Sequence, residues 1–209
     1  MSRNVLRLNP CSIRKVARLC AERSWRRRHA RHAFHAGLRL GHGPWRGLHA
    51  VRLIDSPLIV VAAPARAARL AAAGGGIAAL AREPLLGGGD QWQRWLALGG
   101  ARLLAPPVAD FNDAGLMLQA TEQDLGLALV LELNAADALQ DGRLVRVSTQ
   151  TLEDRDLSTY WLVHPPELAD WPPLVALRGW LRDEMAQSRR ALARSLRRNG
   201  EPTVKRRRR

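Results

Sequence analysis

Through most of this chain, short apolar runs typical of β-strands alternate with segments of helical periodicity. The run 57–64 (PLIVVAAP) is rich in β-branched residues and ends at a proline, which is typical of a buried strand. The segment 90–98 (DQWQRWLAL) instead places Trp92, Trp95 and Leu96 on one side of a helix. Strands that alternate with helices usually form a parallel sheet covered by helices. The pattern therefore predicts an α/β fold with a largely parallel sheet.

The other expected elements follow the same two periodicities. Further strands are expected at 36–40, 48–53, 84–87, 127–133, 143–148 and 158–166. Further helices are expected at 65–73, 134–142 and 172–185, and one more, capped by Asn112 or Asp113, runs to Gln123. The side chains expected to point inward from the last two of these helices are Leu116, Ala120, Leu174, Leu177, Leu181 and Met185.

The net charge of +14 is concentrated at the two ends of the 209-residue chain. Residues 1–35 carry +9, residues 186–209 also carry +9, and the middle, 36–185, carries −4. Neutralising phosphates requires an excess of Lys and Arg, which the middle lacks. Any affinity for nucleic acid is therefore expected to come from the ends of the chain. A run of like charges such as the basic tail is typical of a solvated segment, which would attract nucleic acid without sequence preference.

The N-terminal 35 residues differ from the rest of the chain. They are rich in arginine and poor in acids, and 12–20 has the spacing of a basic amphipathic helix. Such composition is also typical of organelle transit peptides, and of a segment with no evolved fold. These three interpretations stay open.

Cysteine content and hydropathy restrict the compartment. The two cysteines, Cys11 and Cys20, are spaced neither as a metal knuckle nor as a redox pair, which favours a reducing compartment without a disulfide framework. No apolar run approaches the length needed to span a bilayer. We expect a cytoplasmic protein without membrane contact.

The segment 36–53 (AGLRLGHGPWRGLHAVRL) holds four glycines, which raises the question of a phosphate-binding loop. Such a loop needs a strand before it and a helix after it, so that helix N–H groups meet the anion. Here the residues that follow Gly47 alternate like a strand. The glycines are therefore interpreted as a wide loop between strands, in which they permit positive φ angles.

Catalytic and metal-binding patterns are lacking in the sequence. His29, His32 and His35 drift around a helix rather than converging on one ion, and no nucleophile lies beside a base. The sequence predicts no enzyme, no cofactor and no metal. Trp161, like the other tryptophans on helices and strands, is expected to fill the core, whereas Trp45 lies in the glycine-rich loop without an evident packing role.

Five blocks of the chain, in this order and spacing, resemble the effector-binding domain of LysR-type transcriptional regulators. The likeness is greatest to the branch typified by the glycine-cleavage activator. The blocks are 36–64, 83–101 (EPLLGGGDQWQRWLALGGA), 111–130 (FNDAGLMLQATEQDLGLALV), 139–147 (LQDGRLVRV) and 160–184, which opens with YWLVHPP.

The resemblance implies a two-lobed α/β domain like the periplasmic binding proteins (type 2), with a small-molecule cleft between its lobes. It assigns 36–185 to this domain and expects the lobe crossovers near 56–64 and 160–165. The family's N-terminal winged helix-turn-helix is not recognisable, and 1–35 stands where part of the first lobe is expected. The resemblance thus suggests a truncated regulator whose first lobe is incomplete, followed by a basic tail at 186–209.

Residues near the expected cleft follow from position, because open α/β sheets bind ligands at strand ends and helix starts. On this basis the candidates for effector contact are Arg39, Gly41, Trp45, Asn112 and Asp113. An equally good interpretation of Asn112 and Asp113 is that they only cap a helix.

The resemblance implies a non-enzymatic module of a DNA-binding transcription regulator that binds a small molecule and forms homo-oligomers. The effector is expected to be a small molecule such as an amino acid or another carboxylate. The alternatives are a basic-tailed protein that binds nucleic acid without sequence preference, and a non-functional remnant.

Overall fold

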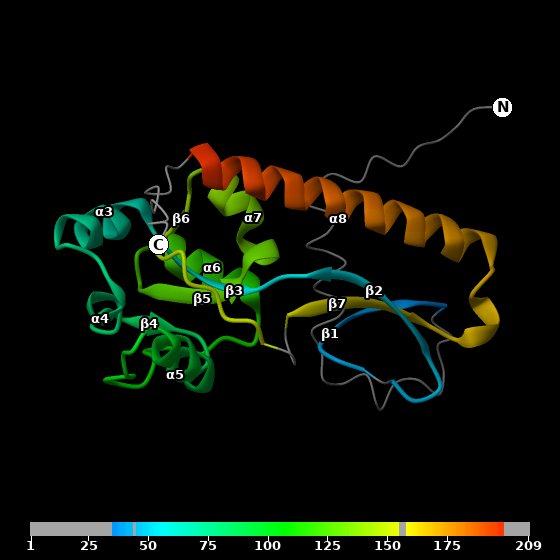
Figure 1. The fold of residues 1–209 in the computed structure, drawn as a ribbon, viewed down its shortest axis with the longest axis horizontal. Coiled ribbons are helices and arrows are strands. Elements are labelled where there is room, and N and C mark those ends of the chain that lie inside the picture. The colour runs from blue at the N-terminus through cyan, green and yellow to red at the C-terminus, as the bar shows by residue number, and fades with distance from the viewer. Residues whose placement is uncertain (1–34, 44, 155–157, 199–209) are drawn as a thin grey trace, which may run out of the picture. The chain divides into compact units, whose positions relative to one another are not determined.

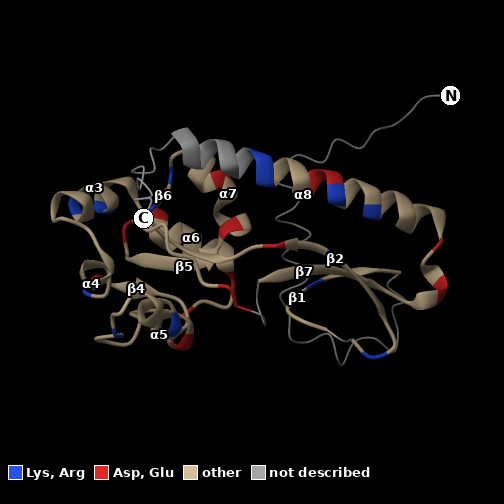
Figure 2. Cartoon of the chain, viewed as in Figure 1, with Lys and Arg blue, Asp and Glu red and all other residues tan. Residues whose placement is uncertain are grey.

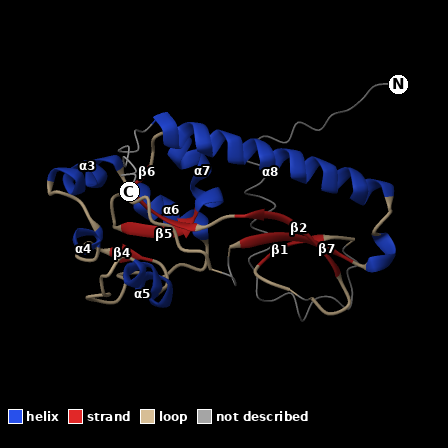
Figure 3. Ribbon diagram, in the orientation of Figure 1, coloured by secondary structure: helices blue, strands red, loops and turns tan. Residues whose placement is uncertain are grey.

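The computed structural model describes residues 35–43, 45–154 and 158–198 (Figure 1). They fall into two compact units, of which the first comprises the described residues up to Ser56 and those from Asp154 to Asp183. The second unit comprises Pro57–Glu153 and the described residues from Glu184 onward. Each unit contains its own β-sheet (Figure 3).

The first unit is built on a three-stranded antiparallel sheet in which β7 lies between β1 and β2. Its strands are β1 (Gly37–Leu40), β2 (His49–Asp55) and β7 (Thr159–His164). A short 3₁₀ helix, η1 (Pro166–Leu168), leads from β7 toward α8 (Pro172–Arg198). Among the described residues, β1 and β2 pair only with β7.

The core of the first unit lies between one face of this sheet and α8. Leu162 of β7 is buried with Leu174 and Leu181 of α8. The expected inward stripe of α8 is confirmed at Leu174, Leu181 and Met185, but Leu177 is 39% exposed. A helix turns by roughly 100° per residue, so Leu177 lies roughly 60° away from Leu174 around the axis. The expectation that Leu177 points inward is therefore wrong.

The second unit has a four-stranded sheet in the order β4-β5-β3-β6. Its strands are β3 (Leu58–Ala62), β4 (Leu85–Leu86), β5 (Leu127–Leu131) and β6 (Val145–Arg146). Its helices are α3 (Pro64–Ala72), α4 (Ile77–Leu80), α5 (Gly89–Leu98), α6 (Ala114–Glu122) and α7 (Glu132–Gln140). The sequence does not predict α4, and β6 is shorter than the run 143–148, whereas the other elements match those expected from the sequence.

Burial in the second unit follows the sequence closely. Both β3 and β5 are buried along their whole length, as their uninterrupted apolar runs predict. Trp92, Trp95 and Leu96 of α5 are fully buried, which confirms the stripe expected on that helix. On α6, Ala120 packs partly against the core as expected, but Leu116 is 49% exposed, because Met117 and Leu118 provide the buried face. The inward placement of Leu116 is wrong.

The expectation of a largely parallel sheet is also wrong. In the second unit β4 pairs with β5 in parallel, whereas β3 is antiparallel to both β5 and β6. The strands β4, β5 and β6 share one direction, because helical crossovers connect β4 to β5 and β5 to β6. The exception is β3, the strand by which the chain enters this unit, which runs opposite to the other three.

Although α8 has 27 residues, neither it nor any other helix in the described part of the chain is long and apolar enough to cross a membrane.

Gly126 stands where β5 approaches the start of β4. A Cβ there would lie 2.5 Å from the Pro84 carbonyl oxygen, which accepts a hydrogen bond of 2.8 Å from the Leu127 amide. We expect Gly126→Ala to lower the free energy of unfolding by about 1–3 kcal/mol, because the two strands must separate. Urea unfolding followed by circular dichroism measures the change.

A matched variant is Gly179→Ala on α8, where an added Cβ meets no atom within 4 Å. Alanine favours helix over glycine, so this variant should gain about 0.5–1 kcal/mol. Equal effects of the two substitutions would contradict a steric requirement at Gly126.

Candidate functional site

A guanidinium and two indoles gather on the sheet of the first unit. The Arg39 Cζ atom lies 6.0 Å from the ring centroid of Trp45. The Trp45 ring meets the Trp161 ring edge-on, with 5.7 Å between centroids and 67° between planes. The first contact is at the outer limit for a cation–π interaction, and the second is a favourable aromatic pair. We call Arg39, Trp45 and Trp161 the cation–aromatic cluster.

Strand register places these side chains together. Trp161 on the central strand lies opposite Arg39 on β1 and opposite Arg52 on β2. Side chains alternate between the two faces of a sheet, so this row lies on the face opposite to Leu162, which packs on α8. A basic and aromatic row thus occupies the face of the sheet opposite to α8.

Arg52 is held within the sheet. Its Nε and Nη2 donate to the two Asp55 carboxylate oxygens at 3.1 and 2.5 Å, and the Thr159 hydroxyl donates to Asp55 Oδ1 at 2.9 Å. This pair is exposed, so its contribution to stability is small. It holds the Arg52 guanidinium on Asp55.

The glycine-rich loop after β1 shapes the cluster. Gly41 has φ of 126° and Gly47 has φ of 78°, a region that residues with a Cβ rarely adopt. The Gly41 amide donates to the Thr159 carbonyl at 3.0 Å, and its carbonyl accepts from Trp161 Nε1 at 2.7 Å. A strand, β2, follows the loop, which confirms that these glycines serve turns between strands rather than a phosphate loop.

Three of the residues predicted from the sequence are therefore neighbours in the structure. Arg39 lies in β1, Gly41 follows β1 directly, and Trp45 lies in the loop to β2. The sequence places Trp161 in the core instead, but Trp161 is only partly buried and contacts both Gly41 and Trp45. The alternation of side chains along β7 predicts the position of Trp161. Tyr160 and Leu162 fill the buried face of the sheet, so Trp161 must lie on the opposite face.

Asn112 and Asp113 belong to the second unit. Asp113 is the N-cap of α6, and its Oδ1 accepts a hydrogen bond of 3.0 Å from the Leu116 amide. Asn112 is exposed just before it. The capping role of Asp113 is thus confirmed. The two residues lie in a different unit from the cation–aromatic cluster.

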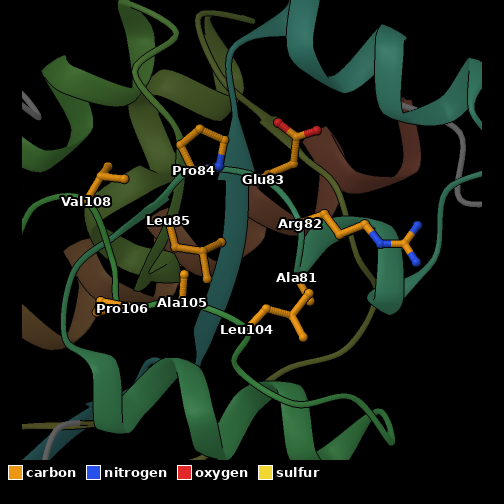
Figure 4. A pocket seen from close by; sticks show the side chains of 9 residues that line it. All are labelled: Ala81, Arg82, Glu83, Pro84, Leu85, Leu104, Ala105, Pro106 and Val108. Atoms are coloured by element: carbon orange, nitrogen blue, oxygen red, sulfur yellow. The ribbon is translucent and has the colours of Figure 1, made fainter.

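A shallow pocket of about 370 Å³ opens in the second unit (Figure 4). Its lining residues are largely apolar: Ala81, Arg82, Glu83, Pro84, Leu85, Leu104, Ala105, Pro106 and Val108. None of the predicted contact residues lines it. Glu83 is already paired with Arg66, and Figure 4 shows the Arg82 guanidinium directed away from the apolar residues. The pocket therefore offers few polar groups that could orient a ligand.

Arg66 and Arg69 of α3 form ionic contacts that hold segments of the second unit together. Arg66 of α3 is 8% exposed and donates from Nε to Asp124 Oδ1 and from Nη2 to the Asp124 carbonyl, both at 2.6 Å. It also pairs with Glu83, and Arg69 of α3 reaches Asp124 Oδ2 at 3.0 Å. Both arginines are marked on α3 in Figure 2.

These contacts change the titration of Asp124. The hydrogen bond from Arg69 holds the pKa of Asp124 below its ordinary value, partial burial opposes this effect, and the hydrogen bond and charge of Arg66 add to it. The carboxylate thus stays ionised and ties α3 to the turn that follows α6. We call Arg66, Arg69, Glu83 and Asp124 the Arg66 cluster.

Within the described ranges, no cluster of three or more His, Cys, Asp or Glu side chains is placed to hold a metal ion. His29 and His32 lie outside the described residues, as do Cys11 and Cys20. The His35 ring lies 4.8 Å from the Trp171 ring.

Comparison with known proteins gives a consistent result. The family model described as "LysR substrate binding domain" matches residues 24–186. The HTH-type transcriptional activator AmpR of Pseudomonas aeruginosa is 31% identical over 150 residues, which is 69% of this chain and 48% of that protein. The AhcY transcriptional activator HvrB of Rhodobacter capsulatus is 30% identical over 155 residues, which is 71% of this chain and 49% of that protein. The chain thus spans about half the length of the curated relatives it matches.

A solved structure shows the same architecture. The effector domain of the transcriptional regulator AmpR of Pseudomonas aeruginosa superposes with a TM-score of 0.61 and 26% sequence identity, covering 80% of this chain and 77% of that one. The predicted fold class, a two-lobed α/β effector domain like the type 2 periplasmic binding proteins, is confirmed by these matches.

Proposed function

Since the chain belongs to the family of LysR substrate-binding domains, we propose that it senses a small-molecule effector for a transcriptional regulator. The observation that carries this proposal is the family match over 24–186, supported by the likeness to the AmpR effector domain. AmpR and HvrB are transcriptional activators, which favours a regulatory and non-enzymatic role for this chain.

We propose the cation–aromatic cluster as the candidate for effector contact on the first unit. A guanidinium binds carboxylates through two parallel N–H donors, and indole rings offer apolar faces beside it. Gly41 contributes by holding Trp161 through its carbonyl. These groups suit a small molecule with a carboxylate and an apolar part, such as an amino acid.

On the second unit we propose Asn112 and Asp113 as candidates for effector contact. Both stand at the start of α6, and the first N–H groups of a helix have no acceptor within the helix itself. Asp113 is partly occupied by capping Leu116, so the Asn112 amide is the better candidate for direct contact. An amide can both donate to a carboxylate and accept from an ammonium group.

Effector binding would act on DNA through linkage. A ligand shifts an equilibrium only by its difference in affinity for two states, and the coupling is reciprocal. We propose that the regulator is a cytoplasmic homo-oligomer that binds DNA. Its two states would differ in how the subunits pack, and this difference in packing would change how the oligomer holds DNA. The basic ends of the chain are an additional, sequence-independent route to DNA.

The narrower assignment to the glycine-cleavage-activator branch is a separate proposal. It rests on the five sequence blocks between residues 36 and 184. AmpR and HvrB, the relatives compared with this chain, carry other names.

The test is a thermal-shift screen of the full chain with amino acids and small carboxylates. A ligand at 100 times its Kd should stabilise the folded state by about 2.7 kcal/mol. For the best ligand found, Arg39→Ala should weaken binding by roughly tenfold or more, because a charge-assisted hydrogen bond contributes about 1.5–3 kcal/mol. Titration calorimetry measures the affinity.

Arg46→Ala is the matched control, because Arg46 is an exposed arginine of the same loop. It should bind the ligand like the parent chain. If Arg39→Ala also keeps the parent affinity while folding normally, the cation–aromatic cluster is not part of the effector site.

A further inference from the structure

Two histidines face each other across the sheet of the first unit. His49 at the start of β2 lies directly opposite His164 at the end of β7. Their ring centroids are 5.0 Å apart, with 62° between the ring planes. His49 is exposed, whereas His164 is 1% exposed. The pair therefore has one ring in contact with solvent and one ring inside the unit.

The hydrogen bonds of His164 define its tautomer. Its Nδ1 lies 2.8 Å from the Pro165 carbonyl oxygen, which can only accept a hydrogen bond. Nδ1 must therefore carry the proton, and in the neutral ring Nε2 then holds a lone pair. That Nε2 is buried and has no hydrogen-bond partner within the described structure.

An unsatisfied polar atom in the interior is costly, and such atoms are uncommon in folded proteins. Two kinds of partner could satisfy Nε2 of His164: a buried water, or a cation that accepts the lone pair. A histidine that ligates a metal almost always donates its other ring N–H to a carboxylate, a carbonyl or water. The bond from Nδ1 to Pro165 gives His164 this feature.

We propose that His49 and His164 bind one late first-row transition ion, such as Zn²⁺, Ni²⁺ or Cu²⁺. Imidazole nitrogen is a preferred ligand of these ions. With metal–nitrogen bonds of about 2.0–2.1 Å and a tetrahedral angle, the centres of two ligating rings lie on the order of 5 Å apart. The observed centroid separation fits this requirement without movement of either strand.

Two protein ligands leave coordination positions for water, and the exposed His49 ring gives them access to solvent. Such a site is weaker than the closed sites with four protein ligands that structural zinc uses. A bound ion would join β2 to β7 at the end where β7 leads into η1. Because only the folded sheet brings the two rings together, ion binding should stabilise the first unit. The proposal does not depend on the effector site.

The experiment uses the full chain labelled with ¹⁵N-histidine. Before metal is added, one ring should show the Nδ1–H tautomer expected of His164. Addition of Zn²⁺ should shift the Nε2 resonance of this ring together with a nitrogen of His49. Reading individual rings is necessary because other histidines of the chain, such as His29 and His32, could bind Zn²⁺ by themselves.

Substitution of the exposed ring provides the decisive variant. His49→Ala should fold normally and should abolish the Zn²⁺-induced shift at His164, or weaken the affinity at that ring by at least about tenfold. His42→Ala is the matched control, since His42 is another exposed histidine of the same unit, and it should leave the shift unchanged.

The proposal is overturned if Zn²⁺, Ni²⁺ and Cu²⁺ all leave the His164 ring unchanged, which would indicate that a buried water satisfies Nε2. It is also overturned if Zn²⁺ shifts the His164 ring resonance in the His49→Ala variant as it does in the parent chain, because His164 would then bind the ion without His49.

Discussion

Replacing Trp92 by alanine should lower the free energy of unfolding of the second unit by about 3–5 kcal/mol, the usual cost of removing a large aromatic side chain from a core. Trp92 is fully buried, and its Nε1 donates to the Leu86 carbonyl at 2.9 Å. It also meets Trp95 edge-on, with 5.8 Å between ring centroids. Urea unfolding followed by far-ultraviolet circular dichroism measures the loss.

Two phenylalanine variants separate the stability cost of lost side-chain volume from the cost of a lost hydrogen bond. Trp92→Phe and Trp95→Phe remove the same atoms from two fully buried positions of one helix. Trp92→Phe also removes the hydrogen bond to Leu86, whereas Nε1 of Trp95 is buried without a partner within the described residues. We expect Trp92→Phe to lose about 1–3 kcal/mol more than Trp95→Phe. An equal loss would show that the Leu86 hydrogen bond contributes nothing net.

The burial of Trp92 and Trp95 is predictable because the signal is local. Residues three and four apart on a helix share a face, and a run such as 127–131 has no polar side of its own to expose. Most strands and helices of both units follow from these two rules. Two side chains are exceptions: Leu116 lies beside Met117 and Leu118, which provide the buried face of α6, and Leu177 lies roughly 60° from Leu174 around α8.

Strand direction and cross-strand neighbours are not predictable in the same way. Pairing of Gly37 with Val163 joins residues far apart in the sequence, and no local pattern specifies that register. For this reason the sequence points to Arg39 and Trp45 but not to Trp161, which completes their cluster. The pairing of His49 with His164 is hidden in the sequence for the same reason.

Nothing in the sequence singles out Arg66. It lies on a helix whose other side chains are mostly alanine, and an arginine there is typical of an exposed position. Its burial depends on Glu83 and Asp124, which approach from two other segments. Asp124 also has φ of 58°, a left-handed conformation that aspartate adopts more readily than most residues.

Because of these contacts, Arg66→Ala should lower the free energy of unfolding at neutral pH by about 3 kcal/mol, near the lower end of the cost of breaking a buried ion pair. The reason is that Glu83 and Asp124 remain behind as acids without their buried partner. Arg69→Ala is the matched control on the same helix. Its side chain is 60% exposed, and it should lose less than about 1 kcal/mol.

The pH dependence of unfolding provides a second measurement on the same variants. The pKa of Asp124 is lowered in the folded state, so between the folded and the unfolded pKa the unfolded chain binds more protons, and stability rises with pH. The contribution of Asp124 should therefore be complete above its unfolded pKa of about 3.9 and should be lost as the pH falls through the lowered folded value. Arg66→Ala should reduce this acid-side loss, because the pKa of Asp124 then moves back toward its ordinary value. If Arg66→Ala and the parent chain lose stability in parallel below pH of about 4, Arg69 rather than Arg66 holds the pKa of Asp124 below its ordinary value.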